Sequence, residues 1–362
     1  MGKYEAAPKH IKASGGGKKR IGLWIALAVV AVLAVWGIWF FTTPPEQKPV
    51  VMPTEQTVTP TQPSQPAGAQ TTQPTDDPAA GEDERQMKKG WYTILLAGTM
   101  DSWNTDTMML CSIDSVNGTV RLVSINRDTQ VDAPIDIPKL NAMYGWKKGG
   151  DEGAATMCAK ITELTGVPIN QYVVIGMDAF KEIIDMIGGV DYNVPFDMYH
   201  KDLNQDYHID IKAGQQNLSG SEALQFVRFR STSENDFGRV NRQKDFLIAT
   251  MKQVLKKFSL AQIEGYIEIF NKNVVTNMSV QDMVWYFTNV ASKLDFDEDV
   301  TSDTLPYAKT GYWTNENANR YKRQSYVYLD PEQIVAYVNE HLNPYTTDIT
   351  VDELNIPHWI DK

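Results

Sequence analysis

A group of basic side chains lies in one short segment of an otherwise acidic chain, where it could bind an anion. The whole chain has a net charge of −11, but residues 225–244 contain only Glu234 and Asp236 as acidic groups. Guanidinium groups stay charged and pair with two phosphate oxygens at once, so they suit phosphate or pyrophosphate better than a lone carboxylate. The basic residues of this segment are Arg228, Arg230, Arg239, Arg242 and Lys244.

Two short elements are predicted to position these side chains. As a strand, 227–230 points Arg228 and Arg230 to one face, because side chains alternate with a period of two. As the start of a helix, 238–243 places Arg239 above Arg242 and Gln243, since residues three and four apart share a face. The alternative is an arginine-rich surface strand and helix that bind nothing.

Two aspartates flank a turn between two predicted strands, in the segment GTMDSWNTDTMML. Magnesium takes one or two carboxylates and completes its octahedron with water and substrate phosphates. We therefore expect Asp101 and Asp106 to hold Mg²⁺ near the arginines. The alternative is that both aspartates only stabilise the turn.

Two further segments carry polar residues suited to the same anion. SINRDT ends a predicted strand with Arg127 and Asp128, and KLNAMY begins with Lys139. Taken alone, each is typical of an ordinary loop, and an Arg-Asp neighbour is more often a local ion pair than a site. A general base for a transfer reaction would be Asp128 or Asp236.

The first 90 residues read as a membrane anchor and a linker. Residues 21–41 carry no charge and at about 1.5 Å per residue span a bilayer core. The tail 1–20 has six basic residues and one acidic residue, so its net charge of +5 favours a cytoplasmic N-terminus. The alternative is a cleaved signal peptide. Residues 42–90 are rich in Thr, Pro and Gln and predict an extended spacer without a core.

The rest of the chain is predicted to be one α/β domain over 91–345, followed by a peripheral tail over 346–362. Strand-like runs alternate with helical patterns at 151–164 and 177–187, as expected when helices cover a largely buried sheet. Beyond the basic tail the net charge is −16, since −11 for the chain includes +5 for the tail; this excludes nucleic acid as a partner.

Two other features of the domain leave alternatives open. Cys111 and Cys158 lie in an apparent strand and an apparent helix; an exported location permits a disulfide, but apolar surroundings favour two buried free thiols. One helical face carries Phe180, Ile183, Ile184 and Ile187, which could line a groove for a lipid. Spacing of this kind is also that of any core helix, and core packing is the favoured interpretation.

Six segments taken together resemble the LytR-CpsA-Psr family in content and order. They are GTMDSWNTDTMML, VRLVSINRDT, KLNAMY, VPINQYVVIGMDAFKEIIDMIGGV, QQNLSGSEALQFVRFR and DFGRVNRQ. The resemblance covers residues 92–247, and more loosely the helical end through 343–345. It implies an α/β/α sandwich with a central mixed β-sheet, on a single N-terminal transmembrane helix in the cell membrane, with the catalytic domain extracytoplasmic.

The resemblance also implies an activity. Family members are phosphotransferases that move a glycopolymer, such as teichoic acid or capsule, from a polyprenyl-pyrophosphate carrier to peptidoglycan. Alternatives are a non-catalytic binder of lipid-linked saccharide or wall polymer, and a polyprenyl-pyrophosphate hydrolase. A transcriptional regulator is disfavoured by the short cytoplasmic tail and the acidic exterior.

Site residues follow from the positions that match the family's motifs. Asp101 and Asp106 match the Mg²⁺ ligands, although Gly98-Thr99-Met100-Asp101 is one residue longer than the family's Gly-x-Asp. Asp101, Asp106, Arg127, Arg228 and Arg230 are the expected catalytic residues. The residues expected to grip the pyrophosphate are Arg127, Lys139, Arg228, Arg230, Arg239 and Gln243, with Arg242 adjacent.

Overall fold

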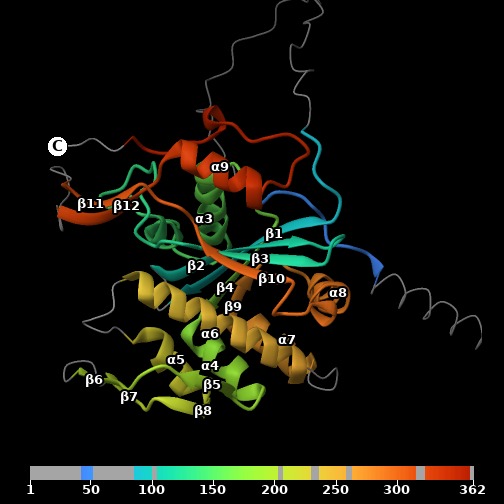
Figure 1. Cartoon of the computed structure of the whole chain (residues 1–362), viewed down its shortest axis with the longest axis vertical. Helices are drawn as coiled ribbons and strands as arrows, with labels where there is room; N and C mark the ends of the chain where they lie inside the picture. The colour runs from blue at the N-terminus through green and yellow to red at the C-terminus, as the bar shows by residue number, and fades with distance from the viewer. Residues whose placement is uncertain are drawn as a thin grey trace, which may run out of the picture.

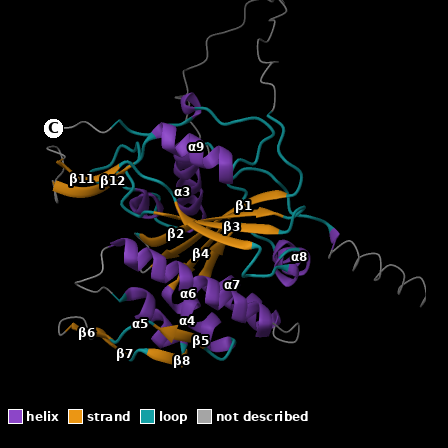
Figure 2. Cartoon of the chain, viewed as in Figure 1, coloured by secondary structure: helices purple, strands orange, loops and turns teal. Residues whose placement is uncertain are grey.

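A six-stranded mixed sheet forms the centre of the protein, with helices on both faces (Figure 1, Figure 2). The computed structural model describes residues 42–51, 85–99, 104–202, 207–229, 236–257, 263–314 and 323–358. The strand order is β10-β3-β2-β1-β4-β9. The strands are β1 (Trp91–Thr99), β2 (Thr105–Asp114), β3 (Thr119–Ile125), β4 (Gln171–Gly176), β9 (Val274–Thr276) and β10 (Val300–Thr304). This is the layered α/β architecture expected from the sequence.

The sheet is mixed, with two parallel and three antiparallel pairs of neighbouring strands. Strand β1 pairs with β2 antiparallel and with β4 parallel, while β3 pairs with β2 antiparallel and with β10 parallel. The hairpin of β2 and β3 turns over 115–118. Gly118 adopts φ of +70° there, and the Asp114 carboxylate accepts from the backbone amides of Val116 and Asn117.

Alternating side chains divide the sheet between two cores. On β1, Leu95 and Ala97 face the core under α3 (Gly150–Thr165) and α9 (Pro331–His341), while Tyr92 and Ile94 face the opposite core. That second core is covered by α6 (Asp236–Lys257), α7 (Ile263–Asn273) and α8 (Val280–Asn289). Strand β1 is therefore buried on both faces.

A third core lies on the far side of α6 and is built by two helices and two antiparallel pairs of strands. Ile184, Phe226 and Phe246 are fully buried in it. Its elements are α4 (Met177–Met186), β5 (Val190–Val194), β6 (Met198–Asp202), β7 (Tyr207–Ile211), β8 (Gly214–Leu218) and α5 (Gly220–Arg228). The remaining elements are the hairpin of β11 (Lys309–Thr314) and β12 (Arg323–Tyr328), α2 (Met143–Trp146), and the short helices η1 (Leu140–Ala142), η3 (Ala291–Lys293) and η4 (Val351–Glu353).

The predicted arginine strand over 227–230 is wrong, because Arg228 is the last residue of helix α5. Ser219 and Glu222 form a capping box at the start of this helix. Ala223 and Phe226, three residues apart, are buried on one face, and Phe229 follows as a buried cap. Helical burial thus overrides the short alternation that favoured a strand.

Both described ends of the predicted linker contact the globular domain. The Gln47 side-chain amide donates to the carbonyls of Lys88 and Trp91 at 3.1 and 2.7 Å, and the Val50 amide donates to Ile169 O at 2.7 Å. Residues 42–51 and 85–90 are therefore part of the fold, and the remainder of the linker, 52–84, lies outside the described residues.

The predicted boundary at residue 345 does not separate a peripheral tail. Ile349 is 1% exposed in the core under α9, and Glu353 forms an ion pair with Arg85. The predicted cytoplasmic tail 1–20 and transmembrane helix 21–41 lie outside the described residues. Among the helices that the structure does describe, none is both long and apolar enough to cross a bilayer.

The two cysteines are buried free thiols, as favoured by the sequence. Cys111 lies in β2 and Cys158 in α3, on opposite faces of the sheet. Burial raises the pKa of Cys111 to about 12 and also raises the pKa of Cys158. Both are inert apolar side chains of the core.

Candidate functional site

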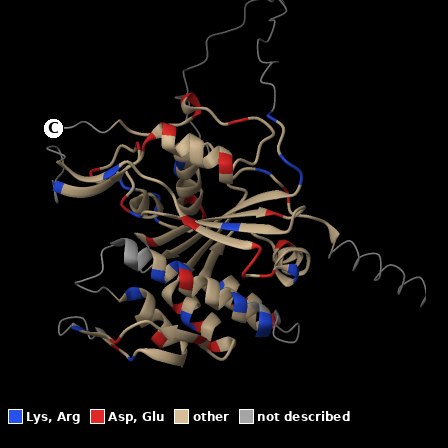
Figure 3. Cartoon of the chain, in the orientation of Figure 1, with Lys and Arg blue, Asp and Glu red and all other residues tan. Residues whose placement is uncertain are grey.

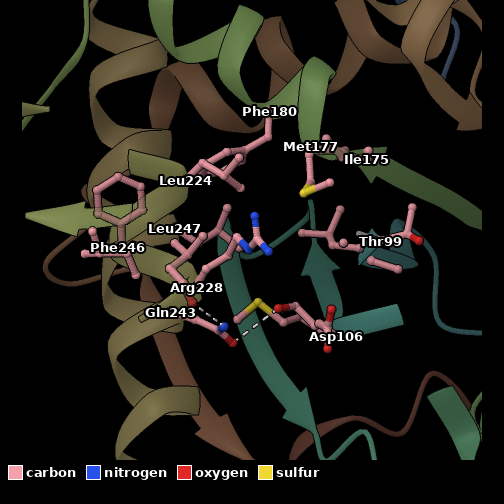
Figure 4. Close-up of a pocket in the computed structure, with 18 of the residues that line it drawn as sticks. Thr99, Asp106, Ile175, Met177, Phe180, Leu224, Arg228, Gln243, Phe246 and Leu247 are labelled. Carbon is pink, nitrogen blue, oxygen red and sulfur yellow. Dashed lines mark hydrogen bonds between the residues drawn. The ribbon is translucent and has the colours of Figure 1, made fainter. Parts of the chain in front are cut away.

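A largely apolar cavity of about 360 Å³ lies between one end of the sheet and the helices α4, α5 and α6 (Figure 4). Most of its wall consists of aliphatic and aromatic side chains from β1, β2, β4 and these helices. The lining includes Leu96, Met109, Ile175, Met177, Phe180, Leu224, Val227, Phe246 and Leu247. Such a wall suits a long apolar chain better than a polar metabolite.

Charged and polar side chains interrupt this wall at Asp106, Arg228 and Gln243. Arg228 extends its guanidinium group into the middle of the cavity, and Asp106 lies below it in the view (Figure 4). Arg228 reaches this position because it is the last residue of α5. The first residue of this helix, Gly220, packs closely on α4: a Cβ there would lie 2.3 Å from Lys181 O. An amphiphilic anion would find its apolar and ionic partners side by side.

A β-bulge directs Asp106 towards the site. Thr99 pairs with Thr105 and Gly98 pairs with Thr107, so Asp106 is the extra residue of β2. A bulge leaves one residue outside the regular pairing and changes the direction of its side chain. The carboxylate consequently lies at the polar end of the cavity.

Gln243 ties the three elements of the polar end together. It accepts a hydrogen bond from Thr107 Oγ1 at 3.2 Å and donates to Val227 O at 2.9 Å. The first bond joins α6 to β2 and the second joins α6 to the last turn of α5, immediately before Arg228. Gln243 therefore positions Arg228 relative to Asp106.

Arg127 leaves the end of β3 and reaches Asp106 from the other side. Its Nη1 donates to Asp106 Oδ1 at 2.6 Å, and its Nε lies 3.8 Å from Asp128 Oδ2. Nε is buried and makes no hydrogen bond to the part of the chain that is described. A buried donor without a partner is costly, which favours an acceptor from a ligand at this position.

Lys139 belongs to the same group of charges, although it lies in a different loop. The Leu140 amide donates to Thr129 O, which holds the two loops together. Lys139 is 8% exposed, and its Nζ lies 2.9 Å from Asp128 Oδ1 and 3.5 Å from Gln324 Oε1. Its ammonium also lies 5.1 Å from the centre of the Tyr326 ring.

The structure brings together Asp106, Arg127, Lys139, Arg228 and Gln243 of the predicted site residues. Arg242 is placed differently: it is 5% exposed, donates to Phe229 O at 2.5 Å and lies between the rings of Phe226 and Phe229. It fastens α5 to α6. Asp101 and Arg230 lie outside the described residues, as does the side chain of Arg239.

Sequence reasoning missed two residues beside this group. Thr107 bonds Gln243, and Lys244 is only 9% exposed in a small cavity shared with Asp106 and Arg127. Lys244 was recognised as part of the basic segment but was not among the predicted contacts. Its Nζ lies 3.5 Å from Ser302 O. The signal that could have identified Lys244 is its place on the buried face of an amphipathic helix, where a lysine is rare unless it has a partner.

The helical face of α4 that could line a lipid groove contributes side chains both to the cavity wall and to the third core. Phe180 lines the cavity, whereas Ile184 and Ile187 are buried in the third core. The favoured interpretation of core packing therefore holds for these two isoleucines, while the wall of the cavity is contributed mainly by other elements.

The described residues fit a magnesium ion in part. Asp106 supplies one carboxylate at the polar end of the cavity, and Mg²⁺ uses one or two carboxylates with substrate phosphates. Within the described ranges no three His, Cys, Asp or Glu side chains form a metal cluster. The second predicted ligand, Asp101, is not among those residues.

The fold and site define a class of α/β/α proteins that can hold an amphiphilic anion, with its apolar part in a cavity and its charge against cations. The chain belongs to the LytR-CpsA-Psr family, because the model of the LytR_cpsA_psr family matches residues 58–342. The resemblance inferred from the six segments is thereby confirmed.

Named relatives and solved structures agree with this assignment. The chain is 31% identical over 277 residues to polyisoprenyl-teichoic acid–peptidoglycan teichoic acid transferase TagV of Bacillus subtilis, covering 72% of this chain and 67% of that protein. It is 31% identical to TagU of Bacillus cereus, covering 62% and 73%. The crystal structure of B. subtilis TagV superposes with a TM-score of 0.57 at 28% identity, covering 72% of this chain and all of that one.

A structure titled TagT bound to LIIa-WTA is more distant. It has a TM-score of 0.53 at 18% identity and covers 70% of this chain and 89% of that chain. At this identity the likeness supports the fold alone.

Proposed function

We propose that this protein is a phosphotransferase that moves a glycopolymer, such as teichoic acid, from a polyprenyl-pyrophosphate carrier to peptidoglycan. One observation carries the proposal: the apolar cavity ends at Arg228 and Asp106, with Arg127 bonded to Asp106. A prenyl pyrophosphate has the same division between a long apolar chain and a compact dianion. The transferase names of the TagV and TagU relatives support this activity.

The cations stabilise the charge that builds up during transfer. The prenyl chain occupies the cavity, and the pyrophosphate lies against Arg228, Arg127 and Lys139. Displacement at phosphorus places additional negative charge on the bridging and equatorial oxygens, and cations held in place beforehand favour the transition state over the ground state. Gln243 and Asp128 contribute by fixing Arg228 and Lys139, respectively.

The bond changes are those of a phosphodiester exchange. A hydroxyl of a peptidoglycan sugar attacks the phosphorus joined to the glycopolymer, the bond from that phosphorus to the bridging oxygen breaks, and polyprenyl phosphate leaves. The hydroxyl proton passes to a base, for which Asp128 and Asp236 are the candidates. Such reactions depend above all on positioning.

Magnesium is the proposed cofactor, with Asp106 and Asp101 as the residues that would hold it. When bound, the ion supplies positive charge that offsets the phosphate oxygens. The proposal also places the protein in the cell membrane through 21–41, with the catalytic domain outside the cytoplasm, where its lipid-linked donor and wall acceptor meet.

Reconstitution tests this function. The full-length chain in detergent is mixed with Mg²⁺, a polyprenyl-pyrophosphate saccharide and peptidoglycan, and the products are separated. We expect polyprenyl phosphate together with saccharide attached to peptidoglycan. Release of free saccharide alone identifies a hydrolase, and the absence of polyprenyl phosphate identifies a non-catalytic binder; either result overturns the proposal.

A further inference from the structure

The β11–β12 hairpin projects from one edge of the molecule, clear of the central sheet (Figure 1). Its inner face packs on the domain, where Trp313 contacts the buried ring of Tyr326 edge-on at 5.8 Å. On its outer face Tyr312 is 68% exposed, and the guanidinium group of Arg323 lies 4.5 Å from the centre of that ring. An aromatic ring and an arginine are thus presented together to solvent.

The charge of this hairpin is opposite to that of the chain as a whole. Its described residues, 305–314 and 323–329, include Lys309 and Arg323 and no acidic residue. Figure 3 shows these basic positions on the hairpin. The outer face carries Arg323 and therefore complements a partner that carries carboxylates, and Tyr and Arg are side chains enriched at binding hot spots.

Backbone hydrogen bonds join the hairpin to the loop that carries Arg127. The Val327 amide donates to Asp128 O at 2.9 Å, and the Gln130 amide donates to Val327 O at 3.0 Å. Arg323 lies four residues along β12 from Val327, a distance of about 13 Å at the usual rise of a strand. The exposed pair of Tyr312 and Arg323 therefore lies on the same hairpin that is hydrogen-bonded to the Arg127 loop.

A chain of side-chain contacts leads from the apolar cavity to the hairpin and indicates which substrate the hairpin faces. From the apolar cavity, Asp106 leads to Arg127, then to Asp128 and Lys139, and then to Gln324 on the inner face of the hairpin. In an in-line displacement the attacking group enters opposite the leaving group. Because the prenyl phosphate leaves towards the cavity, the attacking glycan enters from the side of the hairpin.

We infer that the outer face of the β11–β12 hairpin binds the acceptor glycan strand. Tyr312 stacks on the apolar face of a sugar ring, and Arg323 pairs with a carboxylate of an attached peptide. This inference rests on the proposed function for the identity of the acceptor. The lipid-linked donor is the competing occupant and is an outcome of the test.

Binding measurements test the inference without requiring turnover. Soluble peptidoglycan fragments that retain their peptides are titrated into the full-length chain in detergent. We expect Tyr312→Ala and Arg323→Ala each to raise the Kd roughly 3- to 10-fold, and Tyr312→Trp to keep near wild-type affinity because it retains a ring. Tyr199→Ala is the matched control, because Tyr199 is 63% exposed on the separate β6–β7 hairpin.

Three results would overturn the inference: a wild-type chain that does not bind the fragments, an unchanged Kd in Tyr312→Ala, or a loss of affinity for the lipid-linked donor instead. Failure of the proposed function gives a different result. In that case the wild-type chain releases no polyprenyl phosphate, but Tyr312→Ala still weakens glycan binding. Thermal unfolding of each variant checks that the hairpin remains folded.

Discussion

Arg127 Nη1 donates to Asp106 Oδ1 at 2.6 Å, which joins the end of β3 to the bulged start of β2. The pair is part-buried, with side chains 21% and 27% exposed. It places a cation and a carboxylate together at the polar end of the cavity. A pyrophosphate there would need the cation, and a magnesium ion would need the carboxylate.

Replacing Arg127 should remove most of the transfer activity. We expect Arg127→Ala to reduce the rate of polyprenyl phosphate release on the order of 10²-fold or more, because a fixed cation is lost where charge develops. Arg121→Ala is the control: Arg121 lies on β3, the strand that precedes Arg127, but pairs with Asp303, away from the cavity. Normal transfer by a folded Arg127→Ala protein would contradict the proposed role.

Filling the cavity should select against long prenyl donors. Leu247 lines the cavity from α6, and a tryptophan there takes up part of its volume of about 360 Å³. Leu247→Trp should raise KM for a long-chain donor roughly 10-fold, equivalent to about two lost methylene contacts, and should change KM little for a short-chain donor. Val280→Trp, at a position 38% exposed on α8, serves as control. An equal rise in KM for both donors would show that the prenyl chain binds outside this cavity.

Both thiols should be unreactive in the native protein. The thiolate is the reacting form, and burial raises the pKa of Cys111 to about 12 and raises that of Cys158 as well. A chromogenic disulfide reagent at neutral pH should therefore label neither cysteine until denaturant is added, after which both should react. Rapid labelling of the folded chain, assigned with Cys111→Ser and Cys158→Ser variants, would show that one thiol is accessible.

The ion pair that ties residue 85 to the C-terminal segment should lose its effect in acid. Arg85 donates to both carboxylate oxygens of Glu353, and this bonding lowers the pKa of Glu353 from 4.5. A carboxyl group with a lowered folded-state pKa stabilises the fold above its unfolded pKa, and this contribution is lost as the pH falls through the folded value. Because both groups are partly solvated, the pair contributes at most about 1 kcal/mol.

Denaturant unfolding of wild type and Arg85→Ala measures this contribution. We expect the difference in the free energy of unfolding to be largest near neutral pH, to shrink as the pH falls below 4.5, and to vanish once Glu353 is protonated in the folded state as well. Lys48→Ala, which removes an exposed pair with Glu46, should show little difference at any pH. A difference that stays constant in acid would show that Arg85 acts through packing on Tyr345 rather than through its charge pair with Glu353.

Local patterns in the sequence were sufficient for some of the elements. The turn at 115–118, the capping box at Ser219, and the helices α3, α4 and α9 follow from signals within a few residues, since turn chemistry and side-chain period act over that range. Six ordered segments were sufficient for the family. The same signals were ambiguous at 227–230, where strand alternation and helical spacing overlap and the burial of Phe226 decided for the helix.

The sequence by itself determined which residue types were available: arginines and aspartates for a pyrophosphate, and apolar faces for a core. Only the tertiary structure decided that Arg228 enters a cavity while Arg242 is buried against Phe229, and that residues 42–51 belong to the domain. The physical reason is that a pattern records which face of an element is buried, whereas the identity of what covers that face depends on contacts between residues far apart in the chain. Lys139 and Gln324, 185 positions apart, meet only because the folded chain brings their loops together.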